Sequence, residues 1–454
     1  MSEHSSLRGS RVTVLGAGIS GVSIALLARR LGASVFVSDA GGISDAAAKT
    51  LESAGIPFEQ GGHTDRALSG DLTVVGSGFP PSAPIVKKLN ERGIEPVGEL
   101  DFVMPHIGGR VIGITGSNGK TTTTSLLAHL LVSAGVKCAA AGNIGAPIAD
   151  LAGRDFDFIA MEVSSFQLHW AKRVSLAGAV MTNLAPDHID WHGSYESYAS
   201  SKARIFDFVE EGGFSVLQER DAGAPKGGMR RPHFLTWGEA SLGNAISLSA
   251  SRRNAVLNGV ELFGFGDTKL LGAHNMENTA MAMAAMKLLG FGERAARSSL
   301  SSFSPPPHRC SLVLEKGGVR YIDDSKGTNI AASSAAMSSI EGPHIVILGG
   351  RGKGEDYAGL VGPLKKFARR AILIGEASGD IAAALDRGEY EGYLAAGDME
   401  SAVKIAAEIA APGESVLLSP ACTSWDSYSN YGERGDHFAS LVRRYAREKD
   451  DPLR

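Results

Sequence analysis

The chain has 454 residues, 43% of them hydrophobic and 21% charged, which is typical of a soluble globular protein of about three domains. A net charge of −4 is too small and of the wrong sign for a nucleic-acid-binding surface. Three cysteines, far apart in the sequence, form no disulfide or metal-binding pattern, as expected in the reducing cytoplasm. No apolar leader and no run of about 18 apolar residues is present, so we expect neither export nor membrane spanning.

The N-terminal part of the chain has the pattern of a Rossmann-like domain. A β-branched run at 11–15 precedes the motif GAGISG (16–21) and an apolar periodic stretch, and Asp39 ends the next strand-like run. A GxGxxG turn between a strand and a helix predicts a site for a diphosphate at a helix N-terminus. Nicotinamide dinucleotides and other nucleotide diphosphates both fit this pattern. We expect the domain to end near residue 105.

A second phosphate motif, TGSNGKT, joins the strand-like run 110–115 to a helix predicted over 121–134. A strict P-loop has glycine where this chain has Ile114, so the regular pattern fails. The physical requirements are still met, because exposed N–H groups, a helix dipole, the Lys120 ammonium and the Thr121 hydroxyl occur together. We therefore expect ATP to bind at this loop.

The central part of the chain predicts a doubly wound, mostly parallel sheet, with strands at about 136–141, 157–161 and 177–182 and a helix at about 275–289. Residues 211–270 have only a weak pattern. Glu162 ends a strand at the edge where the phosphate loop lies, as expected of a Mg²⁺ ligand. The segment that follows carries Asp187, His188, Asp190, His192 and Lys202. Partial histidine ligation of Mg²⁺ is one interpretation of this segment, and histidines that face solvent or form hydrogen bonds are the other.

A proline-rich linker, SPPPH (304–308), precedes a third α/β part. The runs VRYIDD, PHIVILGG, RRAILIG and ESVLLSP predict its strands. Polar residues follow these runs, where a ligand carboxylate or phosphate could be held: Lys326, Thr328, Lys353, Ser424 and Arg434. Taken singly, each could equally be an ordinary surface residue.

The chain resembles the Mur ligase family over essentially its whole length. The resemblance rests on GAGISG, TGSNGKTTT, GNIG, MEVSSFQL, TNLAPDHIDWH, YASSKARI, AHNMEN, PHR, DDSKGTN, LGGRGKG and LSPACTSWDSYSNYGERG, in this order. It implies three α/β domains: a Rossmann-like domain for a UDP-linked substrate (1–105), a P-loop-type ATPase domain with a mostly parallel sheet (106–303) and a Rossmann-like domain for an amino acid (304–454).

The resemblance also implies an activity. A monomeric, cytoplasmic ligase of peptidoglycan precursor synthesis would use ATP and two Mg²⁺ ions to phosphorylate the terminal carboxylate of UDP-N-acetylmuramoyl-L-alanine. The amine of D-glutamate would then displace phosphate from the acyl phosphate to form an amide.

Residue roles follow from the same resemblance. The residues implied around ATP are Gly116, Ser117, Asn118, Gly119, Lys120, Thr121, Thr122, Asn275, Asn278, Arg309 and Asp324. Those implied around the UDP-linked substrate are Gly18, Ile19, Ser20, Asp39, Ser77 and Asn143. D-Glutamate would meet Lys326, Thr328, Ser424 and Tyr431, with Lys353 near the reacting groups. Thr121 and Glu162 would hold one Mg²⁺, and His188 with Lys202, carried as a carbamate, the other.

Three departures from the family pattern leave the acceptor amino acid open, with L-glutamate or lysine as alternatives. Gly327 stands where alanine is familiar, Tyr431 where phenylalanine is, and GSGFPPSAP lacks the usual turn near the UDP site. Other protein classes explain less. A nicotinamide oxidoreductase would leave Lys120 and Glu162 without a role, a non-catalytic nucleotide-binding protein would not need Lys202, and a folylpolyglutamate synthase would not need a UDP domain.

Overall fold

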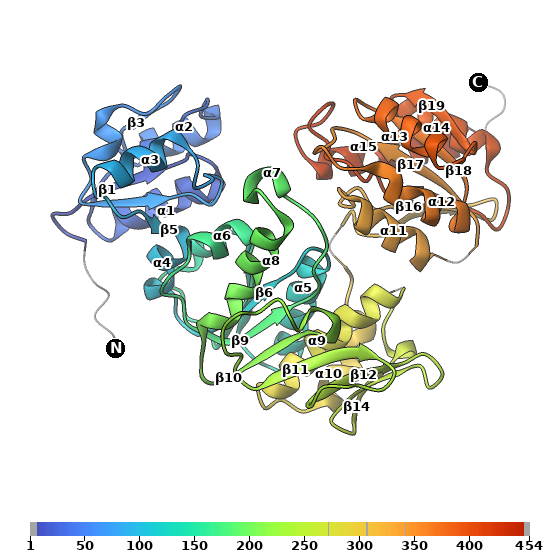
Figure 1. The fold of residues 1–454 in the computed structure, drawn as a ribbon, viewed down its shortest axis with the longest axis horizontal. Coiled ribbons are helices and arrows are strands. Elements are labelled where there is room, and N and C mark those ends of the chain that lie inside the picture. Colours follow the sequence, from blue (N-terminus) through green and yellow to red (C-terminus); the bar gives the residue numbers. More distant parts are fainter. Residues whose placement is uncertain (1–6, 271, 306, 341, 449–454) are drawn as a thin grey trace. The chain divides into compact units, whose positions relative to one another are not determined.

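The first sheet has five parallel strands in the order β3-β2-β1-β4-β5, the arrangement of a Rossmann-like domain (Figure 1). The computed structural model describes residues 7–270, 272–305, 307–340 and 342–448. The strands are β1 (Arg11–Leu15), β2 (Ser34–Ser38), β3 (Phe58–Glu59), β4 (Leu72–Val75) and β5 (Val97–Gly98). The helices are α1 (Ile19–Arg30), α2 (Asp45–Ser53), α3 (Pro84–Glu91) and α4 (Glu99–Val103).

The turn between β1 and α1 requires glycine at two positions. Gly16 has a φ of +98°, a conformation that L side chains rarely adopt. A Cβ atom on Gly21 would lie 2.0 Å from the carbonyl oxygen of Gly16, so only glycine lets α1 pack this closely against the strand.

The second sheet has nine strands in the order β14-β13-β12-β11-β10-β9-β6-β8-β7. All neighbouring pairs from β7 to β12 are parallel, as predicted, and β12, β13 and β14 are antiparallel. The strands are β6 (Arg110–Thr115), β7 (Cys138–Gly142), β8 (Phe158–Glu162), β9 (Leu176–Met181), β10 (Val209–Gln218), β11 (Pro232–Trp237), β12 (Ala245–Ser249), β13 (Asn254–Leu257) and β14 (Val260–Gly264). The helices are α5 (Lys120–Ser133), α6 (Ser165–Trp170), α7 (Ile189–His192), α8 (Tyr195–Ala203), α9 (Ala273–Leu288) and α10 (Glu293–Ser299).

The weakly patterned interval 211–270 is therefore a regular part of this sheet. The two residues between β13 and β14, Asn258 and Gly259, both have positive φ, as a type I′ hairpin turn requires. Strands β12 and β13 alternate buried and less buried residues over only five and four positions, and β14 does not alternate, so none of the three stands out in the sequence.

The third sheet has six strands in the order β15-β16-β20-β17-β18-β19, and only the β15–β16 pair is antiparallel. The strands are β15 (Ser311–Lys316), β16 (Val319–Asp323), β17 (His344–Gly349), β18 (Ala368–Ile374), β19 (Tyr393–Gly397) and β20 (Ser415–Leu418). The helices are α11 (Ile330–Ser339), α12 (Val361–Phe367), α13 (Ser378–Arg387), α14 (Met399–Ile409) and α15 (Tyr431–Glu448).

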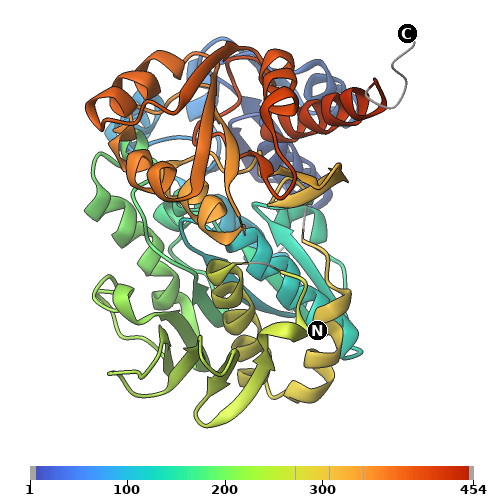
Figure 2. The same ribbon diagram turned by 90° about the vertical axis from the view of Figure 1, so that its right-hand side faces the viewer.

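Helices cover both faces of the third sheet (Figure 2). Val346 and Leu348 of β17 pack in one core with α11, α12 and α13. Ile345 and Ile347 of the same strand pack in a second core with α14 and α15. Because successive residues of a strand point to opposite faces, a continuous apolar run is what a sheet covered on both sides needs.

The chain forms two compact units. The first unit contains residues 1–268 and 278–302, with the first two sheets, and the second contains residues 269–277 and the chain from Phe303, with the third sheet. Within the first unit, the two sheets are joined by buried contacts, including a hydrogen bond of 3.0 Å from Trp170 Nε1 to the carbonyl oxygen of Phe79. No helix in the described ranges is long and apolar enough to cross a membrane.

Candidate functional site

The predicted phosphate loop lies between β6 and α5, and two of its residues have to be glycine. Gly116 and Gly119 have φ values of +141° and +81°. A Cβ atom on Gly116 would lie 1.9 Å from Thr182 Oγ1, and one on Gly119 would lie 2.2 Å from Asn278 Oδ1. The loop thus leaves the strand and enters the helix N-terminus in a conformation open only to glycine, which suits the close approach of a phosphate to backbone N–H groups.

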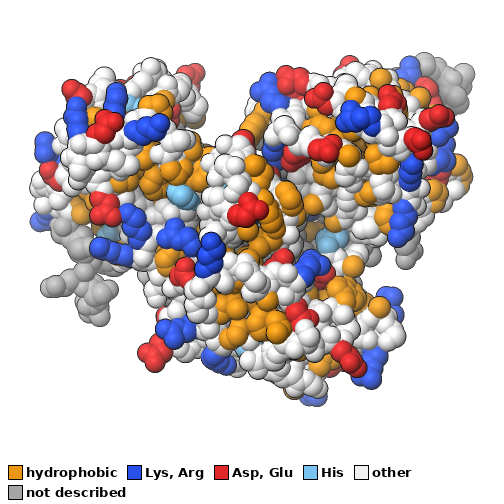
Figure 3. All heavy atoms as spheres, in the orientation of Figure 1, with side chains coloured by type: hydrophobic (Ala, Val, Ile, Leu, Met, Phe, Trp, Pro, Cys, Tyr) orange, Lys and Arg blue, Asp and Glu red, His pale blue; other side chains and the backbone are white. Residues whose placement is uncertain are grey.

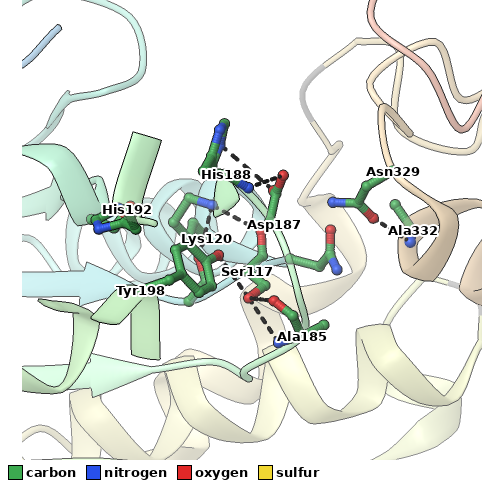
Figure 4. A network of polar contacts seen from close by, with 12 residues as sticks. Ser117, Lys120, Ala185, Asp187, His188, His192, Tyr198, Asn329 and Ala332 are labelled. Carbon is green, nitrogen blue, oxygen red and sulfur yellow. Dashed lines mark hydrogen bonds and ion pairs between the residues drawn. The ribbon is translucent and has the colours of Figure 1, made fainter. Parts of the chain in front are cut away.

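The loop after β9, which contains Asn183 and Ala185, and Tyr198 of α8 hold the phosphate loop in place (Figure 4). The Ser117 hydroxyl lies 2.8 Å from the Tyr198 hydroxyl and 2.9 Å from the carbonyl oxygen of Ala185. The backbone N–H of Asn118 donates to Asn183 Oδ1 over 3.0 Å. The side chain of Ser117 is therefore used inside the protein, and internal hydrogen bonds hold the phosphate loop in this conformation.

Lys120 and Thr121 begin α5 and point to two different partners. Lys120 Nζ donates to the carbonyl oxygens of Gly116 and Ser117 over 2.9 and 3.0 Å, so the ammonium lies over the loop. Thr121 Oγ1 donates to Glu162 Oε2 over 2.7 Å. Thr122, also predicted near ATP, is buried in the same helix turn.

Glu162 ends β8 and joins two of the predicted site residues. Its carboxylate accepts from Thr121 and, over 3.1 Å, from Asn143 Nδ2. The side chain is only 2% exposed. Thr121, Asn143 and Glu162, which lie far apart in the sequence, therefore meet at one edge of the second sheet, where an oxygen-ligated cation could be held.

Lys202 is buried beneath the phosphate loop. It lies on α8, is 2% exposed, and donates from Nζ to the carbonyl oxygen of Gly116 over 2.7 Å. Burial lowers the pKa of its amine well below the ordinary lysine value, and the positive charge of Lys120 lowers it further. A neutral amine is the form that reacts with carbon dioxide, so this environment suits a carbamate.

His188 lies at the start of α7 in the left-handed conformation, with a φ of +53°. Its Nε2 is 3.6 Å from Asp187 Oδ2. Its ring centre is 6.4 Å from that of Tyr198, and Lys202 Nζ is 4.8 Å from the same Tyr198 ring. The structure thus places both proposed ligands of the second Mg²⁺ around one aromatic side chain.

His192 has a different environment. Its Nε2 lies 3.0 Å from Ser165 Oγ, and the residue is buried. Burial, helped by the charges of His169 and Lys202, lowers its pKa to about 4. His192 is therefore a neutral, hydrogen-bonded core histidine, the second of the two interpretations for this segment.

The side chains around the phosphate loop suit Mg²⁺ better than a metal ion that is held by protein side chains alone. Across the described ranges, no three His, Cys, Asp or Glu side chains gather as a preformed metal site. Mg²⁺ keeps several waters and takes phosphate oxygens, so it needs few protein ligands. The pairs Thr121 with Glu162 and His188 with Lys202 fit that requirement.

The residues predicted around adenine and ribose fall into two groups. Asn275 and Asn278 lie buried on α9, and Asn278 Oδ1 accepts from Thr123 Oγ1 of α5 over 3.4 Å. Asp324 lies in the second unit, where burial raises its pKa to about 7 and the charge of Arg309 opposes the rise. Its Oδ2 accepts from Ser419 Oγ over 2.6 Å, so this carboxyl already has a partner inside the protein.

Five of the six residues predicted around the UDP-linked substrate lie at the carboxyl edge of the first sheet, whereas Asn143 follows β7 at the edge of the second sheet. Gly18, Ile19 and Ser20 form the N-terminus of α1, and Ile19 is 80% exposed. Asp39 follows β2, and its Oδ2 accepts from the backbone N–H of Ala17 over 2.7 Å. The Asp39 carboxylate therefore shapes the glycine turn itself.

Glu99 is a residue of this region that the sequence did not single out. It is 3% exposed, and its Oε1 accepts from Gln167 Nε2 over 3.3 Å. Its Oε2 has no hydrogen-bond partner, although the nearby hydroxyls of Ser20 and Ser77 favour the ionised form. Burial outweighs them and raises the pKa of the carboxyl. Glu99 follows the short strand β5 without any recognisable motif, so the sequence gave no indication that its carboxyl is buried.

Replacing Glu99 with glutamine is expected to stabilise the protein at alkaline pH. The folded state holds the Glu99 proton more tightly than the unfolded state, whose glutamate pKa is about 4.3. The free energy of unfolding should therefore fall as the pH rises above that value. Glutamine removes this loss, so Glu99→Gln should add about 1–3 kcal/mol at pH 8 and less at pH 5, measured by urea unfolding. The control Glu91→Gln, at an exposed position of α3, should leave the free energy of unfolding unchanged at both pH values. An equal increase in the free energy of unfolding of Glu99→Gln at pH 5 and pH 8 would contradict the argument.

The residues predicted for the amino acid follow three neighbouring strands of the third sheet. Lys326 and Thr328 come after β16, Ser424 after β20 and Lys353 after β17. Lys326 Nζ lies 3.9 Å from the ring centre of Tyr431. Since the carboxyl ends of parallel strands meet at one edge, these side chains share that edge.

Arg434 does not hold a ligand as the sequence suggested. Its side chain is 1% exposed, and its guanidinium donates to Ser325, Cys422 and Thr423 of the protein itself. Elsewhere, on the face shown in Figure 3, basic and acidic side chains are interspersed, without a continuous surface of one sign.

Three family models match the chain in order. The MurD N-terminal domain matches residues 11–85, the Mur ligase middle domain residues 114–286, and the Mur ligase, glutamate ligase domain residues 308–422. The chain is 37% identical over 442 residues to the UDP-N-acetylmuramoylalanine--D-glutamate ligase of Pelotomaculum thermopropionicum, which covers 95% of this chain and 97% of that protein. It is 36% identical over 450 residues to the ligase of the same name of Acidobacterium capsulatum, with 96% of each chain covered.

Solved structures share the fold at low sequence identity. A pseudomurein peptide ligase type C from Methanothermus fervidus has a TM-score of 0.60 at 18% identity, and covers 96% of this chain and 100% of its own. UDP-N-acetylmuramate-alanine ligase MurC from Thermotoga maritima has a TM-score of 0.59 at 17% identity, with 96% and 99% covered. The predicted three-domain α/β architecture is thereby confirmed.

Proposed function

The chain belongs to the Mur ligase family, and we propose that it joins D-glutamate to UDP-N-acetylmuramoyl-L-alanine at the expense of ATP, in peptidoglycan precursor synthesis. The observation that carries this function is the match, over at least 95% of the chain, to relatives named for that ligation. A nicotinamide oxidoreductase would not need the buried arrangement of Lys120, Glu162 and Lys202.

The three parts of the chain divide the substrates among them. Residues 1–105 bind the UDP-linked substrate through Gly18, Ile19, Ser20, Asp39 and Ser77, residues 106–303 bind ATP, and residues 304–454 bind the amino acid. The protein works as a monomer in the cytoplasm. Its free cysteines, Cys138, Cys310 and Cys422, support a reducing compartment.

The phosphate loop supplies the first half of the chemistry. A carboxylate is a poor electrophile, so its oxygen must first accept the γ-phosphoryl group of ATP to give an acyl phosphate. The N–H groups at the N-terminus of α5 and the Lys120 ammonium meet the charge that develops on the transferred group. The hydrogen bonds of Ser117 and Asn118 to the loop after β9 hold the phosphate loop in position. Asn275, Asn278, Arg309 and Asp324 take the nucleoside.

Two Mg²⁺ ions, when bound, neutralise phosphate charge. Thr121 and Glu162 hold one of them, as their mutual hydrogen bond of 2.7 Å supports. His188 and carbamylated Lys202 hold the other. An ammonium at Lys202 would repel a cation, whereas a carbamate offers an anionic oxygen, and Asn143 keeps the Glu162 carboxylate oriented.

Residues after the strands of the third sheet serve the second half of the reaction, the formation of the amide bond. Lys326, Thr328, Ser424 and the backbone around Tyr431 bind the carboxylates of D-glutamate, and Lys353 lies close to the reacting groups. The amine of D-glutamate attacks the acyl carbon, and phosphate leaves from the tetrahedral intermediate. Water has to be excluded while the acyl phosphate exists.

Release of ADP and phosphate tests this function directly. The purified chain is supplied with ATP, Mg²⁺ and UDP-N-acetylmuramoyl-L-alanine, and with D-glutamate, L-glutamate, lysine or no amino acid. Release that requires D-glutamate is expected. Release with another acceptor would keep the ligase and change its substrate, and no release with any acceptor, even with added bicarbonate, would overturn the proposal.

A second candidate, a ligase of this family with another acceptor, has one observation in its favour. A Cβ atom on Gly327, where alanine is familiar, would lie 2.5 Å from Asp324 Oδ2 and 2.8 Å from Ser419 Oγ. An alanine in the segment that carries Lys326 and Thr328 would therefore require the hydrogen-bonded side chains of Asp324 and Ser419 to shift. The acceptor comparison above separates the two candidates.

A further inference from the structure

Arg434 is a buried cation whose hydrogen bonds all go to uncharged oxygens. It lies in the first turns of α15. Nε donates to Ser325 Oγ over 2.9 Å and Nη2 to the carbonyl oxygen of Ser325 over 2.7 Å. Nη1 donates to the carbonyl oxygens of Cys422 and Thr423, both over 3.1 Å, and Nη2 also to that of Cys422 over 3.1 Å. The five N–H groups of the guanidinium are thereby used.

Burying the charge of Arg434 costs free energy, which indicates that its hydrogen bonds have a structural role. Among the described residues, no carboxylate accepts a hydrogen bond from Arg434; burial lowers its pKa to about 10, and the charges of Asp426 and Asp323 oppose this fall. Burying a charge in this way destabilises a fold unless its hydrogen bonds compensate. Only arginine presents five donors in a fixed plane, so the side chain suits the task of holding several backbone oxygens at set positions.

We propose that Arg434 and Ser325 together form a clamp that positions the binding site for the acceptor amino acid. The clamp joins two segments: Ser325 follows β16, and Cys422 and Thr423 follow β20. Ser325, which is fully buried, both accepts from Arg434 Nε and donates from Oγ to the carbonyl oxygen of Tyr431 over 2.8 Å.

Three of the residues proposed for the amino acid, Lys326, Ser424 and Tyr431, directly adjoin the clamp or are hydrogen-bonded to it. Lys326 directly follows Ser325, and its ammonium lies over the ring of Tyr431. Ser424 directly follows Thr423. The inference rests on the proposed function, because these residues matter to the clamp only if they bind the acceptor.

The clamp also reaches the loop after β17. The backbone N–H of Thr423 donates to the carbonyl oxygen of Arg351 over 3.0 Å, and Arg351 N–H donates back over 2.9 Å. This loop carries Lys353 two residues later. A shift of Thr423 would therefore move three loops at one sheet edge together, and misplacement by about 1 Å can cost on the order of 100-fold in rate or binding.

Two variants test the clamp, with a matched control. Ser325→Ala removes one hydroxyl, and Arg434→Lys keeps the charge but loses the planar set of donors. Arg369→Lys is the control, because Arg369 begins β18 at the opposite edge and bonds Glu414 and the carbonyl oxygen of Ile409. In full-length protein, KM is measured for ATP, for the UDP-linked substrate and for the acceptor amino acid. The acceptor is D-glutamate, or whichever amino acid the unaltered protein uses.

The expected result is a rise in KM for the acceptor of about tenfold in Ser325→Ala and about 100-fold in Arg434→Lys. The KM values for ATP and the UDP-linked substrate should stay within about twofold, and Arg369→Lys should leave all three unchanged. An unchanged acceptor KM in both clamp variants, or equal changes in all three KM values, would overturn the clamp.

Hydrogen exchange gives a readout that does not depend on turnover. Within 421–428 the amides of Ala421, Thr423, Ser427 and Tyr428 are hydrogen-bonded, so they should exchange faster in both clamp variants than in Arg369→Lys. Unchanged exchange would refute the clamp even if the protein ligated no amino acid. Faster exchange in a chain that releases no ADP with any acceptor would instead uphold the clamp and overturn only the proposed function.

Discussion

Replacing Lys120 with alanine is expected to lower turnover by about 10³-fold while leaving the protein folded. The Lys120 ammonium lies over the phosphate loop, bonded to the carbonyl oxygens of Gly116 and Ser117. Its loss leaves the charge of the transferred phosphoryl group without this partner. Release of ADP in the presence of all substrates measures the effect.

Stability should not explain the loss. Lys120 begins α5, where a positive charge opposes the helix dipole and alanine is the better helix former, so the melting temperature should stay the same or rise. Lys137→Ala is the matched control, because Lys137 is an exposed lysine of the same domain that pairs with Asp155. Turnover of Lys120→Ala within about tenfold of the unaltered protein would contradict this role of the ammonium.

Lys202→Ala is expected to have an effect of similar size for a different reason. The buried, neutral amine of Lys202 should take up carbon dioxide, and the variant loses the anionic oxygen that the carbamate provides. In protein incubated with ¹³C-bicarbonate, a carbamate carbon signal should appear in NMR spectra and be absent from the variant. Acetate should restore part of the turnover of Lys202→Ala, because a carboxylate can occupy the vacated space.

Further variants distinguish the role of Lys120, a positive charge at the phosphate loop, from that of Lys202, an anionic carbamate. Acetate should not restore Lys120→Ala, whose missing charge is positive. Lys202→Arg should be as inactive as the alanine variant, since a guanidinium is not carbamylated and stays charged. A Lys202→Arg variant with near-normal turnover, or a carbamate signal that persists without Lys202, would show that the second Mg²⁺ is held in another way.

The sequence predicted those parts of the structure that depend on local pattern. The glycine turns before α1 and α5 and the parallel strands β6, β8 and β9 follow from short motifs and apolar runs, and they lie where expected. The hairpin of β13 and β14 was missed although the Asn258–Gly259 pair, a standard signal for a two-residue turn, was present.

Other features depend on contacts between distant segments. Arg434 was considered either as a residue that could hold a ligand or as an ordinary surface residue, but it is buried, and its partners are backbone oxygens and a hydroxyl up to 109 residues away, which no local pattern reveals. The burial of Glu99 follows from the packing of α4 and α6, which come from separate domains of the first unit. The residues Lys202 and His188 were selected by resemblance, and their shared neighbour Tyr198 emerged only in three dimensions.

Helix α9 limits how this protein could exchange parts with its relatives. Residues 269–277, including the start of the helix, belong to the second unit, whereas residues 278–302 belong to the first. The chain thus changes from one unit to the other three times before β15, the first strand of the third sheet. A recombination event with a single crossover, even at the proline-rich linker, would therefore leave one unit with a segment from the other parent. A chimaera in which each unit comes from one parent needs three junctions, after residues 268, 277 and 302.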